Sequence, residues 1–576
     1  MKKKKSLFFL FTVFFTILAI FVTHEVWDRK INENGENKKV EGETIIAEKS
    51  KQRDALIYGI TAPPEGIYSS AFYSSTIDAE VLALFDEPLI SYNENMEPEP
   101  NIASWKTEDN KTFHFTFEKG VKWHNGEELT VNDWAFALET IASSDYDGPR
   151  YKNVQGIEGV EFFHSGKAEF ISGIKVINDY EIIINFEKEH VNNLTNLWMY
   201  ALPQSVLGDL PVAEISVSEW VHSTPIGIGP FKVKKVVPGE SVEFSKFDNY
   251  WNGNVNLEKI IMRVIDESSI VDVLQNGEVD MITLKPITAH EVEDLENIEI
   301  FTYPGRSYYY IGFKLGKFDS STQTISETWP KYESKDLREA LMYAIDRQKW
   351  VDKFFFGYGD VVNKPVPSAF WNAADESELI SYQYDPAKSE VLLEKAGYRD
   401  LNDDGFREDK NGEEFIVKFY HYATGNPTFE KRAKAIVQYW EAVGIKTELE
   451  MIEVNLYYNM IEKDDPLIET FFGGWETEVD SDPASFWKAD QLWNYTRYNN
   501  TEADQLLDKA LNHDIVGINQ EKRIELYTEW QKILNKDIPM LYMAELKEIK
   551  ALNKHVGGVK YDVSGQNNPA EWFISN

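Results

Sequence analysis

The chain has 576 residues, and the rough prior of 100–200 residues per domain predicts two to four domains. Acidic residues (96) outnumber basic ones (59), which gives a formal charge of −37. This balance argues against a nucleic-acid binder and against a polybasic lipid-binding face. A hydrophobic content of 43 % indicates a globular protein. The absence of cysteine excludes disulfides, zinc–thiolate sites, iron–sulfur clusters and cysteine nucleophiles.

The N-terminus has the pattern of a secretory segment. Four lysines, Lys2 to Lys5, precede an apolar run from Leu7 to Val22. We expect residues 1–23 to be a signal-anchor or a signal peptide. No small-residue cleavage site follows the run, which favours an uncleaved membrane helix with the remaining chain outside the cytoplasm. Residues 24–53, rich in Lys, Glu and Asn, are predicted to be a disordered tether.

Strand patterns dominate the first 300 residues of the globular part. The segment 113–117 alternates, with three Phe on one face, as a half-buried strand does. The further expected strands are 56–60, 181–186, 231–237 and 260–265.

Helices are predicted from their start and stop signals. Thr130 with Asp133 forms a capping-box pattern, and Asp336 with Glu339 forms a second one. Asp385-Pro386 starts a helix that Gly397 ends. An apolar stripe over 433–440, closed by Gly444, predicts another helix. Helices and strands interleave from about 330 to 460, so we expect an α/β fold with two lobes of different texture.

Sequence signatures of catalysis are missing. The chain contains neither H-E-x-x-H nor G-x-S-x-G. The Gly-rich segment 227–230 ends in Pro230, which lacks the backbone donor that a phosphate cradle uses, so we interpret it as a tight turn. These motifs leave enzymatic activity unsupported but not excluded.

One segment resembles the front half of a calcium loop. It fits D-x-[DN]-x-[DN]-G, with candidate ligands Asp400, Asn402, Asp404, Phe406 (through its carbonyl) and Glu408. The twelfth position is Asn411 rather than the usual Glu. The alternative interpretation is an Asx-rich turn after the helix that ends at Gly397. No cofactor is required by the sequence, and a structural Ca²⁺ is the one metal it suggests.

Several motifs, in one order, resemble those of the family-5 extracellular solute-binding proteins, the oligopeptide and dipeptide receptors of ABC importers. The segments that carry the resemblance are 100–105, 115–126, 129–133, 227–232, 249–253, 337–347, 384–398 and 404–405. The similarity covers roughly residues 55 to 550. Segments 60–66 and 72–75 look similar to the oligopeptide-binding branch of Gram-positive bacteria.

The resemblance implies a two-lobed periplasmic-binding-protein-like fold with mixed β-sheets flanked by helices and an extra subdomain in lobe one. Lobe one would comprise 54–309, with 548–576 returning to it, and lobe two would comprise 310–547. The ligand would be enclosed between the lobes as they close about a hinge.

The resemblance also implies where a peptide would bind. An Asp after a Trp-containing strand of lobe two would hold the α-amine; Asp480 is the first candidate and Glu478 the second. Trp475 would floor a side-chain pocket. Pro64, Glu65, Phe72 and Tyr73 would line the cleft from lobe one. The alternatives are a solvated loop acid for each carboxylate and an ordinary core residue for Trp475.

The function implied is capture of oligopeptides and their delivery to an ABC transporter permease by a monomer at the extracellular side of the cell membrane. Receptors of this family in Gram-positive cells are normally lipoproteins, and this chain lacks the required Cys. Attachment would then rest on the N-terminal helix, unless cleavage releases the protein.

Other functions stay open at this stage. Related receptors carry nickel chelates, haem or sugars; a chelate receptor would need a cleft-facing His, for which His421 is a candidate, although an ordinary surface residue is the other interpretation. A membrane-anchored hydrolase and an adhesion scaffold are more remote alternatives.

Overall fold

The computed structural model describes residues 55–423, 427–477, 482–565 and 568–575. They belong to one compact unit, Arg53–Asn576. The predicted signal segment (1–23) and tether (24–53) lie outside the described residues. Within the described ranges, no helix combines the length and the apolarity needed to cross a bilayer.

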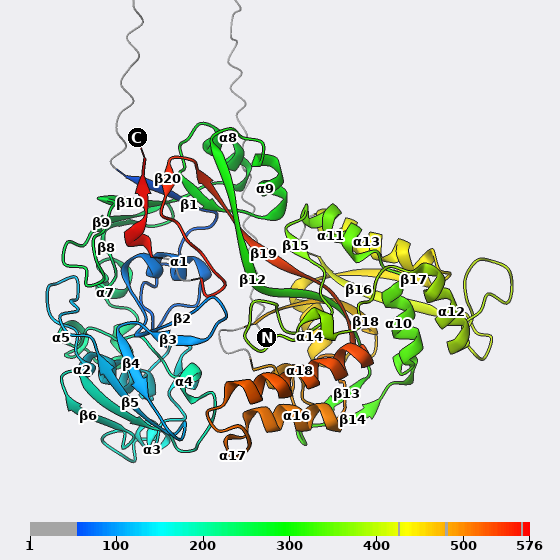
Figure 1. Ribbon diagram of the computed structural model, residues 1–576, viewed down its shortest axis with the longest axis horizontal. Coiled ribbons are helices and arrows are strands. Elements are labelled where there is room, and N and C mark those ends of the chain that lie inside the picture. Colours follow the sequence, from blue (N-terminus) through cyan, green and yellow to red (C-terminus); the bar gives the residue numbers. More distant parts are fainter. Residues whose placement is uncertain (1–54, 424–426, 478–481, 566–567, 576) are drawn as a thin grey trace, which may run out of the picture. The chain divides into compact units, whose positions relative to one another are not determined.

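An eleven-stranded mixed sheet forms the framework (Figure 1). In this sheet β1 is parallel to both β10 and β11, and β16 is parallel to both β17 and β18. The remaining strand pairs are antiparallel. In spatial order the strands are β17 (Lys446–Glu453), β16 (Ile416–Ala423), β18 (Thr470–Glu476), β12 (Ile298–Phe313), β19 (Met540–Asn553), β11 (Met281–Thr283), β1 (Leu56–Ile60), β10 (Lys259–Val264), β9 (Ser241–Lys246) and β8 (Phe231–Val237), with β15 (Gly359–Asp360) beside β19.

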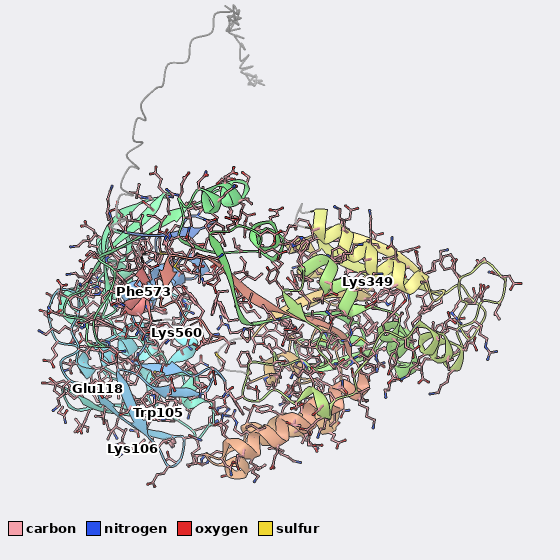
Figure 2. The ribbon with its side chains drawn as sticks, turned by 45° about the horizontal axis from the view of Figure 1, so that its top comes forward. Trp105, Lys106, Glu118, Lys349, Lys560 and Phe573 are labelled. Atoms are coloured by element: carbon pink, nitrogen blue, oxygen red, sulfur yellow. The ribbon has the colours of Figure 1, made fainter. Side chains whose placement is uncertain are left out.

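A second, antiparallel sheet builds a subdomain in the first part of the chain. Its order is β4 (Ala103–Lys106), β5 (Thr112–Phe117), β7 (Glu181–Asn185) and β6 (Ile174–Asn178), and Figure 2 labels Trp105 and Lys106 on β4. The Phe side chains of β5 are buried, and Phe115 packs edge-on against Trp134 with ring centroids 4.8 Å apart. The alternating pattern therefore predicted the buried face correctly. Three hairpins complete the strands: β2 (Ile90–Tyr92) with β3 (Pro98–Pro100), β13 (Gly316–Asp319) with β14 (Thr324–Thr328), and β20 (Val556–Gly557) with β21 (Phe573–Ile574).

The helices surround these sheets. They are α1 (Thr76–Phe85), α2 (Val131–Ala142), α3 (Val160–His164), α4 (Asn193–Asn196), α5 (Gln204–Leu207), α6 (Val212–Ile215), α7 (Glu219–His222), α8 (Ile270–Gln275), α9 (Pro286–Val292), α10 (Lys335–Tyr343), α11 (Arg347–Phe355), α12 (Pro386–Ala396), α13 (Pro427–Glu441), α14 (Val454–Glu462), α15 (Ala484–Trp487), α16 (Thr501–Leu511), α17 (His513–Val516) and α18 (Gln520–Asp537).

Most of the predicted helix signals are confirmed. Thr130 and Asp133 form the expected capping box of α2, and Asp385 caps α12, which Gly397 ends in a left-handed conformation. The predicted cap of α10 is wrong by two residues. Ser334 accepts from the N–H of Leu337 as the cap, while Asp336 lies in the first turn and pairs with Lys395 at 2.9 Å. Ser and Asp are both preferred at this position because their side-chain oxygens accept from the first free N–H groups of a helix.

The backbone of the Gly-rich segment 227–230 lies close against the backbone of Phe85. A Cβ on Gly227 would lie 2.1 Å from the carbonyl oxygen of Phe85, at the end of α1. The N–H of Gly229 donates to the same oxygen at 2.9 Å. The segment therefore fixes the start of β8 against α1, which agrees with the predicted turn rather than with a phosphate cradle.

Candidate ligand-binding cleft

Two long strands carry the chain between the predicted lobes (Figure 1). β12 and β19 pair from Ile298/Asn553 to Gly312/Met540, with an irregularity between Pro304 and Tyr308. At one end β19 pairs with β11, and at the other end β12 pairs with β18. The predicted lobe boundaries at 309/310 and 547/548 fall inside these two strands. The register shifts again between Tyr309 and Tyr310, and such breaks in the ladder suit a hinge element.

A cavity of about 340 Å³ lies beside this irregularity. Ser307 and Tyr309 of β12 and Glu548 of β19 line it, together with Gly59 and Glu80 of predicted lobe one. Burial raises the pKa of Glu548, and the nearby Lys550 ammonium opposes that shift. The hinge strands thus border a space with a partly desolvated carboxyl group.

Trp475 lies near the end of β18 and is half-buried. Its ring packs against Phe486 and Tyr495, with centroids 4.5 and 5.2 Å away. Gly473 lies two residues before Trp475. A Cβ at this position would lie 2.4 Å from the buried Tyr310 ring, so a glycine is needed here. These contacts build an aromatic surface around Trp475. Its role as a pocket floor stays a prediction.

One edge of β18 lacks a strand partner beyond Phe471. β16 pairs with β18 only at Thr470 and Phe471, whereas β12 pairs with β18 as far as Glu476. Along 472–476, therefore, one side of the strand has no ladder partner within the part of the chain that the structure describes. An unpaired edge offers main-chain donors and acceptors to an extended ligand.

The two candidate anchors for an amine, Asp480 and Glu478, lie outside the described residues. The next acid along the chain, Asp482, is described. Its Oδ1 accepts from the N–H of Ala484 at 3.0 Å, and burial raises its pKa. The Arg523 guanidinium and the Lys488 ammonium act in the opposite direction on that pKa.

The four candidates from predicted lobe one separate in the structure. Glu65 is exposed, and its Oε2 accepts from the hydroxyl of Ser74 at 3.4 Å; Pro64 is half-buried. Tyr73 lines a cavity of about 710 Å³. Phe72 does not face a cleft: it is 5 % exposed and packs in the subdomain core. The prediction that Phe72 lines the cleft is therefore wrong: Phe72 is part of the subdomain core, whereas its neighbour Tyr73 lines a cavity.

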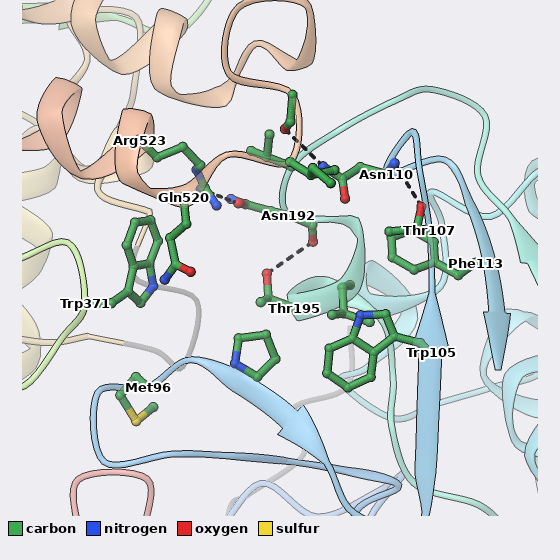
Figure 3. A pocket seen from close by; sticks show the side chains of 15 residues that line it. Met96, Trp105, Thr107, Asn110, Phe113, Asn192, Thr195, Trp371, Gln520 and Arg523 are labelled. Atoms are coloured by element: carbon green, nitrogen blue, oxygen red, sulfur yellow. Dashed lines mark hydrogen bonds between the residues drawn. The ribbon is translucent and has the colours of Figure 1, made fainter. Parts of the chain in front are cut away.

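A smaller cavity, of about 150 Å³, lies between residues of the two predicted lobes (Figure 3). Arg523 of α18 donates from Nη2 to Asn192 Oδ1 at 2.8 Å, and Gln520 Nε2 donates to Glu97 Oε1 at 2.8 Å. Trp371 covers the Arg523 guanidinium, whose central carbon is 4.9 Å from the ring centroid. These hydrogen bonds join segments of 97–192 to α18.

Comparison with known proteins decides the family. A profile described as bacterial extracellular solute-binding proteins, family 5 (middle part), matches residues 97–488. The chain belongs to this family. It is a family of extracellular solute-binding proteins, which fits a location outside the cytoplasm.

Relatives of this family-5 protein match it over most of its length. The oligopeptide-binding protein AppA of Bacillus subtilis is 24 % identical over 569 residues, covering 97 % of each chain. The oligopeptide-binding protein OppA of Lactococcus lactis subsp. lactis is 24 % identical over 488 residues, covering 81 % of this chain and 80 % of that protein. The solved structure of B. subtilis AppA with a nonapeptide superposes with a TM-score of 0.65 at 23 % identity, covering 91 % of this chain and 99 % of that one. The predicted α/β fold of two-lobed binding proteins is confirmed.

The calcium-like segment of this family-5 protein forms hydrogen bonds within itself. Asp400 Oδ2 accepts from the N–H of Gly405 at 2.9 Å, and Asn402 Oδ1 accepts from the N–H of Asp404 at 2.9 Å. Both oxygens of Glu408 accept hydrogen bonds at 2.8 Å, from the N–H of Leu401 and from the Asn402 amide. The N–H of Phe406 donates to Asp404 Oδ1 at 2.8 Å. These contacts are those of an Asx-rich turn, and calcium binding stays a prediction.

His421 belongs to the core, so its interpretation as a surface residue is wrong, and it does not face a cleft. It is 0 % exposed, its Nδ1 donates to the carbonyl of Tyr422 at 2.8 Å, and its ring stacks on Phe472 with centroids 4.5 Å apart. Burial, with the neighbouring Arg432, lowers its pKa to about 3.

Three residues at these cavities were not predicted from the sequence. They are Asp86, Glu87 and Arg523. Asp86 and Glu87 directly precede Pro88, at the end of α1. No local pattern distinguished them from the many other acids of this chain, since their neighbours come from distant segments.

Proposed function

We propose that this family-5 protein captures oligopeptides between its two lobes and delivers them to the permease subunits of an ABC transporter. One observation carries the proposal: relatives that align with 97 % and 81 % of the chain are named oligopeptide-binding proteins. Peptides present an α-amine and regularly spaced amides, so a receptor for them needs main-chain partners and a carboxylate.

The geometry around β18 suits such a ligand. The unpaired edge of 472–476 would pair with an extended peptide, and the aromatic group of Trp475, Phe486 and Tyr495 would hold an apolar side chain. We propose that Asp480 anchors the α-amine, with Glu478 as the alternative. Peptide binding of this kind depends on the backbone and tolerates many side chains.

Closure of the lobes would supply the signal for delivery. A ligand that contacts both 54–309 and 310–547 stabilises the closed arrangement by its differential affinity. Residues 1–23 would hold the monomer at the membrane, and residues 548–576 would complete lobe one. In this proposal the protein performs no chemical step, and the transporter's ATPase belongs to a separate subunit.

Native mass spectrometry before and after refolding tests the proposal. The full-length chain, expressed in the cytoplasm and purified in detergent, should carry a heterogeneous added mass that refolding removes and that sequencing identifies as short peptides. A refolded protein that binds no peptide from a mixed pool contradicts the proposal. Capture of a nickel chelate, haem or a sugar instead would favour those ligand classes.

A further inference from the structure

The cavity beside Tyr73 lies within predicted lobe one, at the end of α1. Its volume is about 710 Å³, and its walls include five tyrosines, Tyr73, Tyr92, Tyr200, Tyr250 and Tyr561. The segments that form it are far apart in sequence: 70–101, 153–200, 250–252 and the C-terminal 560–565 and 568–569. A space of this size admits more than one side chain.

Two neighbouring carboxylates, Asp86 and Glu87, line this cavity. The two oxygens of Glu87 accept from the Tyr250 hydroxyl at 2.5 Å and from Trp251 Nε1 at 3.1 Å. The Asp86 carboxylate accepts from the backbone N–H groups of Glu87 and Ile228, and it forms no ion pair with any residue that the structure describes. Both side chains are only partly accessible. Desolvation raises the pKa of Asp86 to about 8 and that of Glu87 to about 7.

The described residues that line the cavity place no cation in an ion pair with Asp86 or Glu87. Glu99 and Asp562 add two further acids to the lining. Lys560 is the one basic residue of the described lining; it is exposed and pairs with Glu571 at 3.4 Å (Figure 2). Arg150 lies against the rings of Tyr73 and Trp198, 4.6 and 5.2 Å from their centroids, and donates to the Tyr73 carbonyl.

We propose that this cavity binds a cationic side chain, Lys or Arg, of the captured peptide; the inference rests on the proposed function. Tyrosine faces contact an aliphatic stem and attract a cation through their quadrupoles. An Asp86 carboxylate surrounded by protein gives a charge-assisted hydrogen bond that is stronger than one in water. Because the acids outnumber Lys560, an acidic side chain in the same place would be repelled.

The test uses refolded full-length protein and defined pentapeptides. The series is pentaalanine with one residue changed, at each of the five positions, to Lys, norleucine or Glu. Norleucine keeps the carbon stem and removes the ammonium group, while the α-amine is common to all peptides. Affinities are measured by isothermal titration calorimetry at pH 8, for the unaltered chain, for Asp86→Asn and for Asp209→Asn, an exposed loop control.

We expect Lys to bind about tenfold or more tightly than norleucine at one position at least, as for a hydrogen bond to a charged group. Asp86→Asn should reduce that ratio to about one while leaving the norleucine affinity unchanged, and Asp209→Asn should keep the ratio. Equal Lys and norleucine affinities in the unaltered chain, or a ratio that survives Asp86→Asn, would overturn this inference alone. Failure of every pentapeptide to bind would overturn the proposed function and this inference with it.

Discussion

Tyr250 donates its hydroxyl hydrogen to Glu87 Oε1 at 2.5 Å across 163 residues of sequence. Trp251 occupies the other carboxylate oxygen. The hydrogen bonds attach the loop after β9 to the end of α1, and they orient Glu87 along one wall of the lobe-one cavity. Asp86, its neighbour, lines the same cavity, and its carboxylate accepts from the backbone N–H groups of Glu87 and Ile228.

The pH dependence of stability should report the burial of Asp86. Its pKa rises from 3.8 to about 8 in the folded chain, so the folded state binds more protons than the unfolded state between about pH 4 and 8. The stability that this group contributes is therefore lost as the pH rises through that window. Relative to the unaltered chain, Asp86→Asn should gain about 1 kcal/mol or more at pH 9 and nothing at pH 4, measured by urea unfolding. An equal effect at both pH values would contradict this assignment.

The preference of the cavity for Lys over norleucine should depend on the protonation of Asp86 and Glu87. The titratable groups that share the cavity with Asp86 are three acids (Glu87, Glu99 and Asp562), Lys560 and five tyrosines (Tyr73, Tyr92, Tyr200, Tyr250 and Tyr561). Since the pKa values of Asp86 and Glu87 are about 8 and about 7, both carboxyls are largely protonated at pH 6. The ratio of Lys to norleucine affinity should therefore increase from pH 6 to pH 8.5. Calorimetry in buffers of different ionisation enthalpy should detect proton release on binding. An affinity ratio that does not change with pH would contradict the role of these two carboxyls in binding the ammonium group.

His124 should make the fold sensitive to acid. Its Nδ1 accepts from the N–H of Gly227 at 3.1 Å and its Nε2 donates to the carbonyl of Gly229 at 2.9 Å, which fixes a neutral ring. Burial lowers its pKa from 6.5 to about 4. Because the unfolded state then binds more protons, stability should fall as the pH falls from about 6.5 to about 4, by about 3 kcal/mol.

The variant His124→Asn isolates that contribution from other titrating groups. It should be less stable than the unaltered chain at pH 7, and the difference should shrink toward pH 4. A difference that stays constant with pH would show that folding does not lower the pKa of this ring. Chemical denaturation at closely spaced pH values provides the measurement.

Gly473 should not tolerate a side chain. A Cβ there would lie 2.4 Å from Tyr310, which is 1 % exposed and cannot move away. We expect Gly473→Ala to destabilise the chain by about 1–3 kcal/mol, as overpacked cores do. Gly156→Ala is the matched control, because its new Cβ would meet Phe186 at an ordinary 3.4 Å. Equal melting temperatures for the two variants would contradict the packing around β18.

A buried charge cluster holds β12 to the loops that surround it. Asp464 contacts the ammonium of Lys314, and its Oδ1 accepts from Arg497 Nε at 2.8 Å; all three side chains are at most 2 % exposed. Asp464→Asn should cost about 3–5 kcal/mol, because it leaves two buried cations without their anion. Glu430→Gln, in an exposed pair with Lys434, should leave the unfolding midpoint unchanged. A small effect of Asp464→Asn in urea unfolding would contradict the cluster.

Local signals in the sequence predicted much of the fold. The capping box of Thr130 and Asp133, the Pro and Gly ends of α12 and the alternating Phe residues of β5 each depend on neighbours within a few positions. The cap of α10 was predicted at Asp336 but is formed by Ser334, because both residue types cap helices and tertiary packing sets where this helix begins.

The cavity in predicted lobe one could not be predicted in the same way. Glu87 is hydrogen-bonded by Tyr250 and Trp251, and both acids share the cavity with the C-terminal 560–565 and 568–569; none of these is near them in sequence. Phe72 and Tyr73 are adjacent aromatic residues. The local turn of the backbone places Phe72 in the core and Tyr73 at the cavity wall. Periodicity carries no information about such a turn.

The measurement that tests the central claim most directly follows the distance between the lobes while peptide is added. The chain contains no cysteine, so Glu118→Cys with Lys349→Cys gives two unique labels, one in each predicted lobe (Figure 2). Glu118→Cys with Phe573→Cys gives a control pair within predicted lobe one. Single-molecule energy transfer on refolded protein should show a shift for the first pair when a mixed peptide pool is added and no shift for the second. An unchanged distance in the first pair, at peptide concentrations that saturate binding, would contradict capture by closure of two lobes.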